Sequence, residues 1–216
     1  MNMITVWGRA TSSNVQVVMW AIAELGLAHE RLDWGGKFGG NDDPAYRAMN
    51  PNGLVPTIRD GDLVMFESPA ILRYLGARYG DENFWPSDPA RRGPLDMWAE
   101  WVKTTLAPPL VYSVFWQLIR TTAADRNHAA IADGVAKLKS LSRMIGQRLG
   151  DGPYLNGEHL CFADIMLGHL LYRYYTLDFE RAETPNLDAY YARLQQRPAY
   201  RAHAMVSYEP LRVPGA

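Results

Sequence analysis

The stretch "RATSSN", from Arg9 to Asn14, places three hydroxyl groups and an amide directly before a predicted helix. Side chains at a helix start can donate hydrogen bonds to an anion, and the positive end of the helix dipole adds to the attraction. Such residues are also the usual N-caps of helices. The stretch therefore predicts either a site that stabilises an anion or a capped helix.

A second polar pair, Glu67 and Ser68, stands where another helix is predicted to begin, with Pro69 at its first position. Ser68 at the N-cap can hold a carboxylate through its hydroxyl and amide groups. Glu67 beside it can pair with an ammonium group. The alternative is a serine that only caps the helix, next to a solvated charge.

The stretch "NPNGLVPTI", from Asn50 to Ile58, opens like a turn and continues as an apolar strand that Pro56 interrupts. Proline has no N–H to donate and is normally confined to sheet edges, bulges and strand starts. Pro56 is therefore expected either to form a special turn at the sheet edge or to stand as an ordinary trans proline at a strand start.

The first eighty residues show both strand and helix patterns. Strands are predicted at residues 3–7, 29–34, 55–59 and 63–66, and Asp60-Gly61 favours a hairpin turn between the last two. Helices are predicted from Val15 to Gly26, from Pro44 to Met49 and from Ser68 to Gly80. The order βαβ, then α, then ββα indicates a small mixed sheet that helices cover.

The remaining residues show only helical patterns. Helices are predicted from Ala90 to Arg120, with a bend near Pro108-Pro109, and within residues 131–149, 162–175 and 186–198. A segment rich in proline and charge, "DENFWPSDPARRGP", separates the two patterns. The chain is expected to form an α/β domain (residues 1–80), a linker (81–90) and an all-helical domain (91–216).

Composition excludes several classes of function. Residues 1–80 carry seven Lys and Arg against eight Asp and Glu, and the remainder carries fifteen of each, so nucleic acid is not an expected partner. Cys161 is the only cysteine, and no Cys/His cluster has metal-ligand spacing, which predicts a reducing compartment and no metal. The longest uncharged run, Thr104 to Ile119, is shorter than the roughly 20 residues of a membrane span. A cytoplasmic protein with no membrane contact is expected.

This order of elements, with "NPNGLVPTI" leading into "FESPAILRYL", resembles the cytosolic glutathione transferases over essentially the whole chain. The opening "VWGRATSSNVQVVMWAIAELGLAHE" is similar to bacterial theta-like members, in which a Ser or a neighbouring polar residue replaces the Tyr of other classes. The resemblance implies a thioredoxin-like N-terminal domain (βαβ-α-ββα, with a mixed four-stranded sheet), an all-α C-terminal domain and a homodimer.

The resemblance also implies glutathione as co-substrate and a set of residues that bind it. In the family the bond before the strand proline is cis, and the main chain of the preceding residue pairs with the tripeptide. The γ-glutamyl end lies at the start of the helix after the sheet, and the glycyl carboxylate meets a cation. The corresponding residues here are Val55, Pro56, Glu67 and Ser68, with Arg9 or Lys37 as the cation.

The nucleophile in such enzymes is the thiolate of glutathione, so the protein must lower a thiol pKa of about 8.5. A hydrogen bond from a serine hydroxyl to the sulfur anion contributes roughly 1.5–3 kcal/mol, which is about one to two pKa units. Counting back without gaps from "ELGLAHE" puts Ser12 where theta- and zeta-like members carry their catalytic Ser. Asn14 is the second candidate, because an Asn near this helix start shares the task in some bacterial relatives.

The family places its second substrate along the first long helix of the helical domain. The stretch "VYSVFWQLIR" offers Tyr112, Phe115, Trp116 and Arg120 there. An aromatic run at helical spacing is also typical of a protein core. If these residues line the pocket, the acceptor is apolar or aromatic, and Arg120 can meet an anionic group.

Three functions remain open from the sequence. The first is conjugation of glutathione to a small electrophile, and the second is glutathione-dependent peroxidase, reductase or isomerase chemistry at the same site. The third is a non-catalytic interaction module with this fold. "RATSSN" contains no Cys and the chain contains no C-x-x-C, which disfavours thiol transfer through the protein's own sulfur.

Overall fold

The computed structural model describes residues 3–216; the first two residues of the predicted domain 1–80 lie outside them. Four strands form one sheet in the order β2-β1-β3-β4. They are β1 (Ile4–Trp7), β2 (His29–Leu32), β3 (Thr57–Asp60) and β4 (Leu63–Phe66). β1 runs parallel to β2 and antiparallel to β3, and β3 runs antiparallel to β4. The predicted mixed four-stranded sheet is confirmed.

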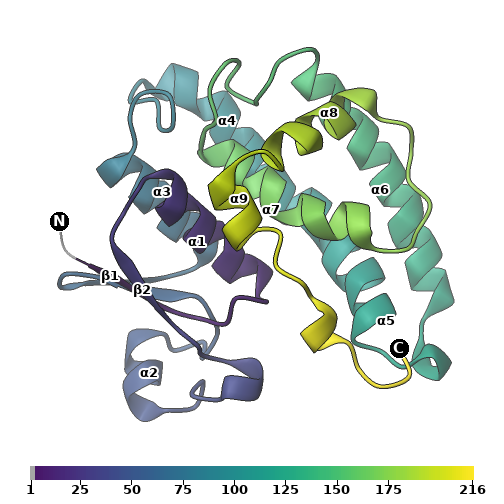
Figure 1. Cartoon of the computed structure of the whole chain (residues 1–216), viewed down its shortest axis with the longest axis horizontal. Coiled ribbons are helices and arrows are strands. Elements are labelled where there is room, and N and C mark those ends of the chain that lie inside the picture. Colours follow the sequence, from purple (N-terminus) through teal and green to yellow (C-terminus); the bar gives the residue numbers. More distant parts are fainter. Residues whose placement is uncertain (1–2) are drawn as a thin grey trace.

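Helices cover this sheet on both sides. They are α1 (Ser13–Glu24), the short 3-10 helix η1 (Gly36–Phe38), α2 (Pro44–Met49) and α3 (Ser68–Tyr79). Figure 1 shows α1 and α3 side by side between the sheet and the helical part of the chain, with α2 on the opposite side of the sheet. This arrangement places the start of α1 and the start of α3 near one another.

Three local predictions need correction. Val55 and Pro56 precede β3, which begins at Thr57. The hairpin loop is Gly61-Asp62, because Asp60 still pairs with Leu63. Ser68 is the first residue of α3, and Glu67 occupies the N-cap position with φ 68 and ψ 104. The sequence pattern marks each boundary to within two residues, and the backbone hydrogen bonds decide the rest.

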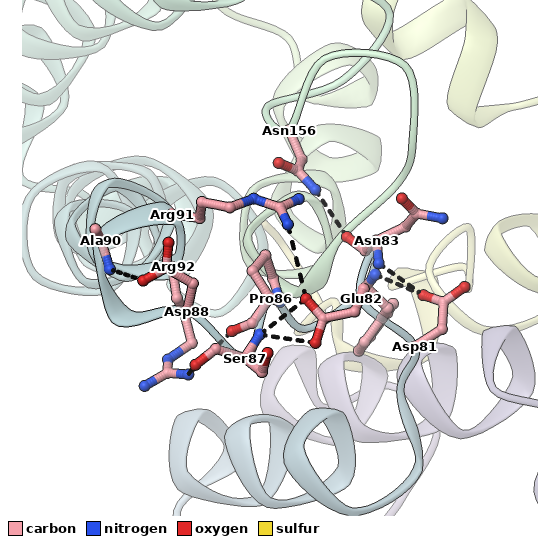
Figure 2. A network of polar contacts seen from close by, with 11 residues as sticks. Asp81, Glu82, Asn83, Pro86, Ser87, Asp88, Ala90, Arg91, Arg92 and Asn156 are labelled. Atoms are coloured by element: carbon pink, nitrogen blue, oxygen red, sulfur yellow. Dashed lines mark hydrogen bonds and ion pairs between the residues drawn. The ribbon is translucent and has the colours of Figure 1, made fainter.

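The segment between α3 and the helical part is fixed by side chains that bind the main chain (Figure 2). Asp81 Oδ1 accepts hydrogen bonds from the main-chain N–H groups of Asn83 and Phe84 at 3.0 and 2.8 Å. Arg92 Nη1 donates to the carbonyl of Pro86 at 2.9 Å. Asp88 caps the next helix by accepting from Ala90 N at 3.0 Å. These contacts hold the start of the first long helix in a defined position.

The remainder of the described chain is helical. A continuous helical run comprises α4 (Pro89–Trp101), η2 (Val102–Leu106), η3 (Pro109–Phe115) and α5 (Trp116–Ile119), and it is followed by α6 (His128–Leu149), α7 (Phe162–Thr176), α8 (Pro185–Leu194) and α9 (Pro198–His203). η2 and η3 are π-helical turns on either side of Pro108. Because proline lacks the N–H that an α-helix needs, the wider π turn keeps the run helical through Pro108-Pro109. The predicted all-helical C-terminal part is confirmed.

α1 is buried from Val15 to Ile22 because it lies between the sheet and the helical part. The Trp20 ring packs edge-on against Tyr200 of α9, with centroids 4.8 Å apart. Glu24 Oε2 accepts from Arg197 Nη2 at 2.6 Å. The C-terminal half of α1 is thereby held against the second half of the chain. No helix within residues 3–216 combines the length and the apolar character needed to cross a membrane.

Candidate functional site

A cavity of about 380 Å³ lies where the start of α1 meets η3 and α5. Residues predicted for two different roles line it together. Ser12 and Asn14 come from the start of α1 and Val55 from the sheet edge, while the predicted second-substrate residues Tyr112, Phe115, Trp116 and Arg120 come from η3 and α5. Arg9, Thr11, Ser13, Asn41, Leu54, Val111, Arg173 and Leu211 complete the wall. We call this space the first cavity.

The loop that carries Ser12 is held from both sides. Gly8 begins it, and a Cβ at this position would lie 2.4 Å from Val15 Cγ2, so the loop can approach α1 only with glycine there. Gln16 Nε2 donates to the carbonyl of Ala10 at 3.1 Å. From the helical part, Arg173 Nη2 donates to the carbonyl of Thr11 at 2.8 Å. The loop is therefore positioned by both parts of the chain.

Ser12 occupies the N-cap position of α1, yet its side chain makes no capping hydrogen bond to a described residue. Its main chain is engaged, because Ser12 N donates to the carbonyl of Arg9 at 3.1 Å. The Ser12 hydroxyl thus faces the cavity wall with its donor uncommitted to the helix. This differs from the capping role that the sequence left open for the stretch.

Asn14 is bound from two directions through one atom. Its Oδ1 accepts from Lys103 Nζ of η2 at 2.9 Å and from Ser68 Oγ of α3 at 3.3 Å. Burial lowers the pKa of Lys103, while the Coulomb attraction of Glu67 and Glu100 opposes this shift. Because Oδ1 has two donors, the amide group of Asn14 is oriented with its N–H atoms available on the other side.

The start of α3 combines a strained residue with a buried one. Among residues 3–216, Glu67 is the only residue other than glycine with positive φ, at 68°. Such a conformation costs about 1–3 kcal/mol and occurs preferentially at functional sites. The Glu67 side chain is exposed, whereas Ser68 is only 2% exposed. A carboxylate and a helix N-terminus therefore lie side by side next to Asn14.

The peptide bond between Val55 and Pro56 is cis. Val55 is half-buried at the sheet edge and lines the first cavity, while Pro56 is buried behind it. No hydrogen bond joins the main-chain N–H or C=O of Val55 to another described residue. The adjacent carbonyl of Leu54 accepts from Tyr46 Oη at 2.6 Å and from Asn50 Nδ2 at 2.8 Å.

A second cavity of about 390 Å³ adjoins the first and shares Arg9, Thr11, Arg120 and Leu211 with it. Lys37 lines only this second cavity, where it is exposed and lies 5.1 Å from the centroid of the Phe38 ring. The two cations predicted for the glycyl carboxylate, Arg9 and Lys37, are thus brought to one space.

Gly35 explains how Arg9 reaches this position. Its φ is 80°, and a Cβ there would lie 3.0 Å from Asn41 Oδ1, 3.1 Å from Arg9 Nη1 and 3.2 Å from Val55 Cγ1. A side chain at Gly35 would therefore displace all three groups. Asn41 Oδ1 and Arg9 Nε are buried and have no hydrogen-bond partner among residues 3–216. Both atoms belong to residues that line the first cavity.

The aromatic residues of the first cavity divide into a buried and an exposed part. Phe115 is 1% exposed and packs edge-on against Tyr208. Tyr112 and Trp116 are 58% and 43% exposed, and their ring centroids lie 5.2 Å apart. All four residues of the predicted second-substrate group line the first cavity, and their role in binding a second substrate stays a prediction.

Sequence reasoning missed Lys103, Asn41 and Arg173. Arg173 stands out in "FADIMLGHLLYRYY" as the one basic residue toward the end of an otherwise apolar, buried helix, and this was a usable signal. Lys103 carries no such signal, since its partner Asn14 is 89 positions away. Leu211 reaches the cavity because the main chain of Val213 donates to the carbonyl of Ile119 at 2.9 Å.

No group of three or more His, Cys, Asp or Glu residues that could hold a metal ion occurs within residues 3–216. The residues that line the first cavity offer hydrogen-bond donors and cations. The first cavity combines a serine hydroxyl, an oriented amide and three arginines with aromatic rings.

Two family models match this chain. The model described as "Glutathione S-transferase, N-terminal domain" matches residues 7–83, and the model described as "Glutathione S-transferase, C-terminal domain" matches residues 128–193. The chain belongs to the glutathione S-transferase family. Within this family, glutathione S-transferase GstB from Escherichia coli (strain K12) is 36% identical over 206 residues, which are 94% of this chain and 99% of that protein.

Solved structures of the family agree with the fold. The theta class glutathione S-transferase from Xanthomonas axonopodis pv. citri with glutathione bound has a TM-score of 0.89 and 44% identity, covering 96% of this chain and 99% of that chain. Glutathione transferase BmGSTD1 from Bombyx mori, at 21% identity, has a TM-score of 0.86 and covers 98% of this chain and 97% of that chain. The predicted resemblance to theta-like glutathione transferases is confirmed.

Proposed function

We propose that this chain binds glutathione, activates its thiol as a thiolate and conjugates the sulfur to a small, apolar or aromatic electrophile. One observation carries the proposal. The first cavity brings Ser12 and Asn14 together with Tyr112, Phe115 and Trp116. The hydrogen-bond donors proposed for the thiolate and the aromatic rings proposed for the acceptor therefore line one space. Family membership supports the reaction, because the matching family and the relative GstB are glutathione S-transferases.

In this proposal glutathione lies along the sheet edge from Glu67 to Lys37. The γ-glutamyl carboxylate binds at Ser68, whose buried position at the start of α3 offers main-chain N–H groups and the helix dipole. Glu67 binds the ammonium group. The main-chain groups of Val55 pair with the cysteinyl residue, and Arg9 or Lys37 binds the glycyl carboxylate.

The thiol of bound glutathione then lies near the start of α1. Ser12 donates its hydroxyl hydrogen to the sulfur, which favours the thiolate over the thiol. Asn14 supports the same charge through its amide N–H, because Lys103 and Ser68 already bind its Oδ1. A pKa lowered from about 8.5 to about 7 raises the thiolate fraction at neutral pH from a few per cent to about half.

The test is formation of a conjugate at a defined carbon. Purified protein, glutathione and 1-chloro-2,4-dinitrobenzene are expected to give the thioether and chloride faster than glutathione and the electrophile alone. Mass spectrometry separates this product from oxidised glutathione, which a peroxidase or reductase would release. Enzyme-dependent formation of oxidised glutathione without any thioether would contradict conjugation and would indicate a peroxidase or reductase instead.

We also propose a homodimer with contacts between the first domain (residues 1–80) of one subunit and the second domain (91–216) of the other, the two being joined by the linker 81–90. Two exposed apolar side chains support it: Phe38 of the first part is 46% exposed and Met97 of α4 is 60% exposed. Light scattering is expected to give twice the chain mass of 24.4 kDa. The proposed location is the cytoplasm, which suits a chain whose single Cys161 is a free thiol.

A further inference from the structure

Three arginines of the first cavity lack the anionic partners that arginines usually have. They are Arg9, Arg120 and Arg173, and we call them the arginine cluster. No Asp or Glu of the described chain lines this cavity. Within residues 3–216, the ion pairs of the molecule involve other residues and none of these three. The cavity therefore carries an excess of positive charge.

Arg173 is the member whose position is hardest to explain by folding alone. It is 4% exposed, and its guanidinium lies 4.2 Å from the centroid of the Phe115 ring. One nitrogen, Nη2, donates to the carbonyl of Thr11, while the buried Nε has no partner among the described residues. Burying a charge is costly unless the charge is paired. A neutral donor would hold the Thr11 carbonyl without that cost.

The neighbouring arginines add to the cost rather than relieve it. Burial and the repulsion of Arg9 and Arg120 lower the pKa of Arg173 to about 10, which still leaves it protonated at neutral pH. Burial and Arg120 likewise lower the pKa of Arg9, whose Nε is also buried without a partner. Two residues of the cavity wall thus each hold a buried N–H group without a partner among residues 3–216.

Glutathione accounts for only part of this charge. Its glycyl carboxylate requires one cation, and Arg9 or Lys37 at the second cavity supplies it. Arg120 and Arg173 remain, and each lies over an aromatic ring, Arg120 at 5.2 Å from the Trp116 centroid and Arg173 at 4.2 Å from that of Phe115. An apolar acceptor that packs against the exposed Trp116 ring would place an attached anionic group beside the Arg120 guanidinium.

We propose that the preferred electrophile of this enzyme is an aromatic or short-chain compound that carries a carboxylate, which Arg120 and Arg173 bind. The inference rests on the proposed function and adds the charge of the acceptor to it. Guanidinium groups bind carboxylates through paired, charge-assisted hydrogen bonds. The carboxylate would stand at the far side of the acceptor from the carbon that the thiolate attacks.

A matched pair of acceptors tests this charge preference. 4-Chloro-3-nitrobenzoate and 4-chloro-3-nitrobenzamide share the ring and the leaving group, and they differ in the charge of one substituent. In both, the glutathione thiolate forms a C–S bond at the carbon that bears chlorine, and chloride leaves with the electron pair of the C–Cl bond. The thiol proton has passed to solvent when the thiolate forms, so the step needs no oxidant or reductant.

The measured quantity is the ratio of kcat/KM for benzoate to that for benzamide, each divided by its rate without enzyme. The wild-type ratio is expected to be about 10 or more in favour of the benzoate, which is the effect of one charge-assisted hydrogen bond. Arg120→Gln is expected to bring the ratio close to one. Arg173→Met should do the same if it folds, and Arg120 is exposed, so its variant keeps the test usable if Arg173→Met does not fold.

Arg91→Gln is the matched control, because it removes one positive charge from an exposed residue of α4 outside both cavities. Its ratio should equal that of the wild type. A wild-type ratio near one, or an Arg120→Gln ratio equal to the wild-type ratio, would overturn the proposal. Conjugation of the benzamide alone would overturn it too, while leaving the proposed transferase function intact.

A second measurement distinguishes acceptor binding by these arginines from stabilisation of the thiolate by the same side chains. The pKa of bound glutathione is read from thiolate absorbance in the wild type and in Arg120→Gln. An unchanged pKa with a lost ratio supports acceptor binding. A raised pKa with equal losses for both acceptors would assign the arginine cluster to the thiolate and overturn the proposal. Absence of conjugation with either acceptor, together with no bound thiolate, would instead contradict the proposed function.

Discussion

Two buried polar clusters of this chain differ in how completely their hydrogen bonds are satisfied. At the start of α7, the Asp164 carboxylate accepts from Leu155 N at 2.9 Å, from Cys161 N at 2.8 Å and from Tyr190 Oη at 3.0 Å. In the first cavity, Arg9, Asn41 and Arg173 each retain a buried polar atom with no partner among residues 3–216. We call the first group the Asp164 cluster.

The difference indicates what each cluster is for. Buried polar groups in folded proteins are nearly always hydrogen-bonded, because an unpaired group costs about 1–3 kcal/mol. The Asp164 cluster obeys this rule and has no group left for a ligand, so its role is to fold the helical part. The first cavity departs from the rule at three residues, which supports the proposal that a molecule binds there.

The largest effect expected at neutral pH comes from breaking the satisfied cluster. Asp164→Ala removes the acceptor of three buried donors, and the free energy of unfolding should fall by about 3 kcal/mol or more. Urea denaturation measures this loss. Asp133→Ala, at an exposed position of α6, is the control and should change stability by less than about 0.5 kcal/mol. A loss in Asp164→Ala no greater than in the control would mean that the cluster does not support the fold.

The next effect concerns activity with the fold retained. Ser12→Ala is expected to lower kcat/KM at least tenfold, about 1.4 kcal/mol, because the thiolate loses its hydroxyl donor. The midpoint of thermal unfolding should change little, since the Ser12 side chain caps no described helix residue. Unchanged turnover in Ser12→Ala, together with a loss in Asn14→Ala, would transfer the donor role to Asn14.

A third prediction concerns the pH dependence of stability that a buried histidine of α7, His169, causes. Burial, with Lys103 and Arg173 nearby, lowers the pKa of His169 from 6.5 to about 3. His169 Nδ1 donates to the carbonyl of Met166 at 2.7 Å, and the lowered pKa keeps the folded ring neutral at neutral pH. The unfolded chain binds the proton first, and stability should fall as pH drops from about 6.5 towards 3, by up to about 1.4 kcal/mol per unit.

His169→Asn should remove this component, because asparagine keeps a donor near Nδ1 but takes up no proton. The difference in unfolding free energy between wild type and variant is followed by urea titration across that pH range. His128→Asn, at the exposed start of α6, is the control and should match the wild type. If the difference in unfolding free energy between wild type and His169→Asn did not change with pH, the buried neutral ring would be contradicted.

The smallest expected effect comes from Lys103, whose side chain donates one hydrogen bond within residues 3–216, to Asn14. Lys103→Met keeps the size of the side chain and removes the donor to Asn14 Oδ1, so the amide loses its fixed orientation. We expect a loss in kcat/KM of about threefold to tenfold, the range of one hydrogen bond, with the pH profile of kcat/KM shifted upward. Lys137→Met on the exposed face of α6 should leave both unchanged. A loss without any shift in the profile would assign Lys103 to packing.

The family and fold were predictable from the sequence because their signals are local. "NPNGLVPTI" and "FESPAILRYL" stand at fixed spacing, and the strand and helix patterns follow the chain in order. The helix start at Ser68 was displaced by one residue, since a cap at Glu67 requires a positive φ that propensity does not favour. The roles of Ser12, Asn14 and the other site residues stay predictions.

The contacts that complete the site were not predictable, because they join residues that are distant in the chain. Lys103 meets Asn14 across 89 positions, and Arg173 meets Thr11 across 162. Nothing near either residue specifies the partner. Whether the aromatic run at Tyr112 to Trp116 lines a cavity or a core likewise depends on how η3 packs against distant parts of the chain such as α6, and the answer is mixed: Phe115 is buried, while Tyr112 and Trp116 are exposed.

The most direct test of the account is the ultraviolet absorbance of glutathione thiolate bound to the protein, titrated with pH beside free glutathione. The account predicts a thiolate that forms at least one pH unit below the roughly 8.5 of a free thiol in the wild type and near the free value in Ser12→Ala. Bound glutathione that titrates like the free tripeptide in the wild type would contradict the claim that this site activates the thiol.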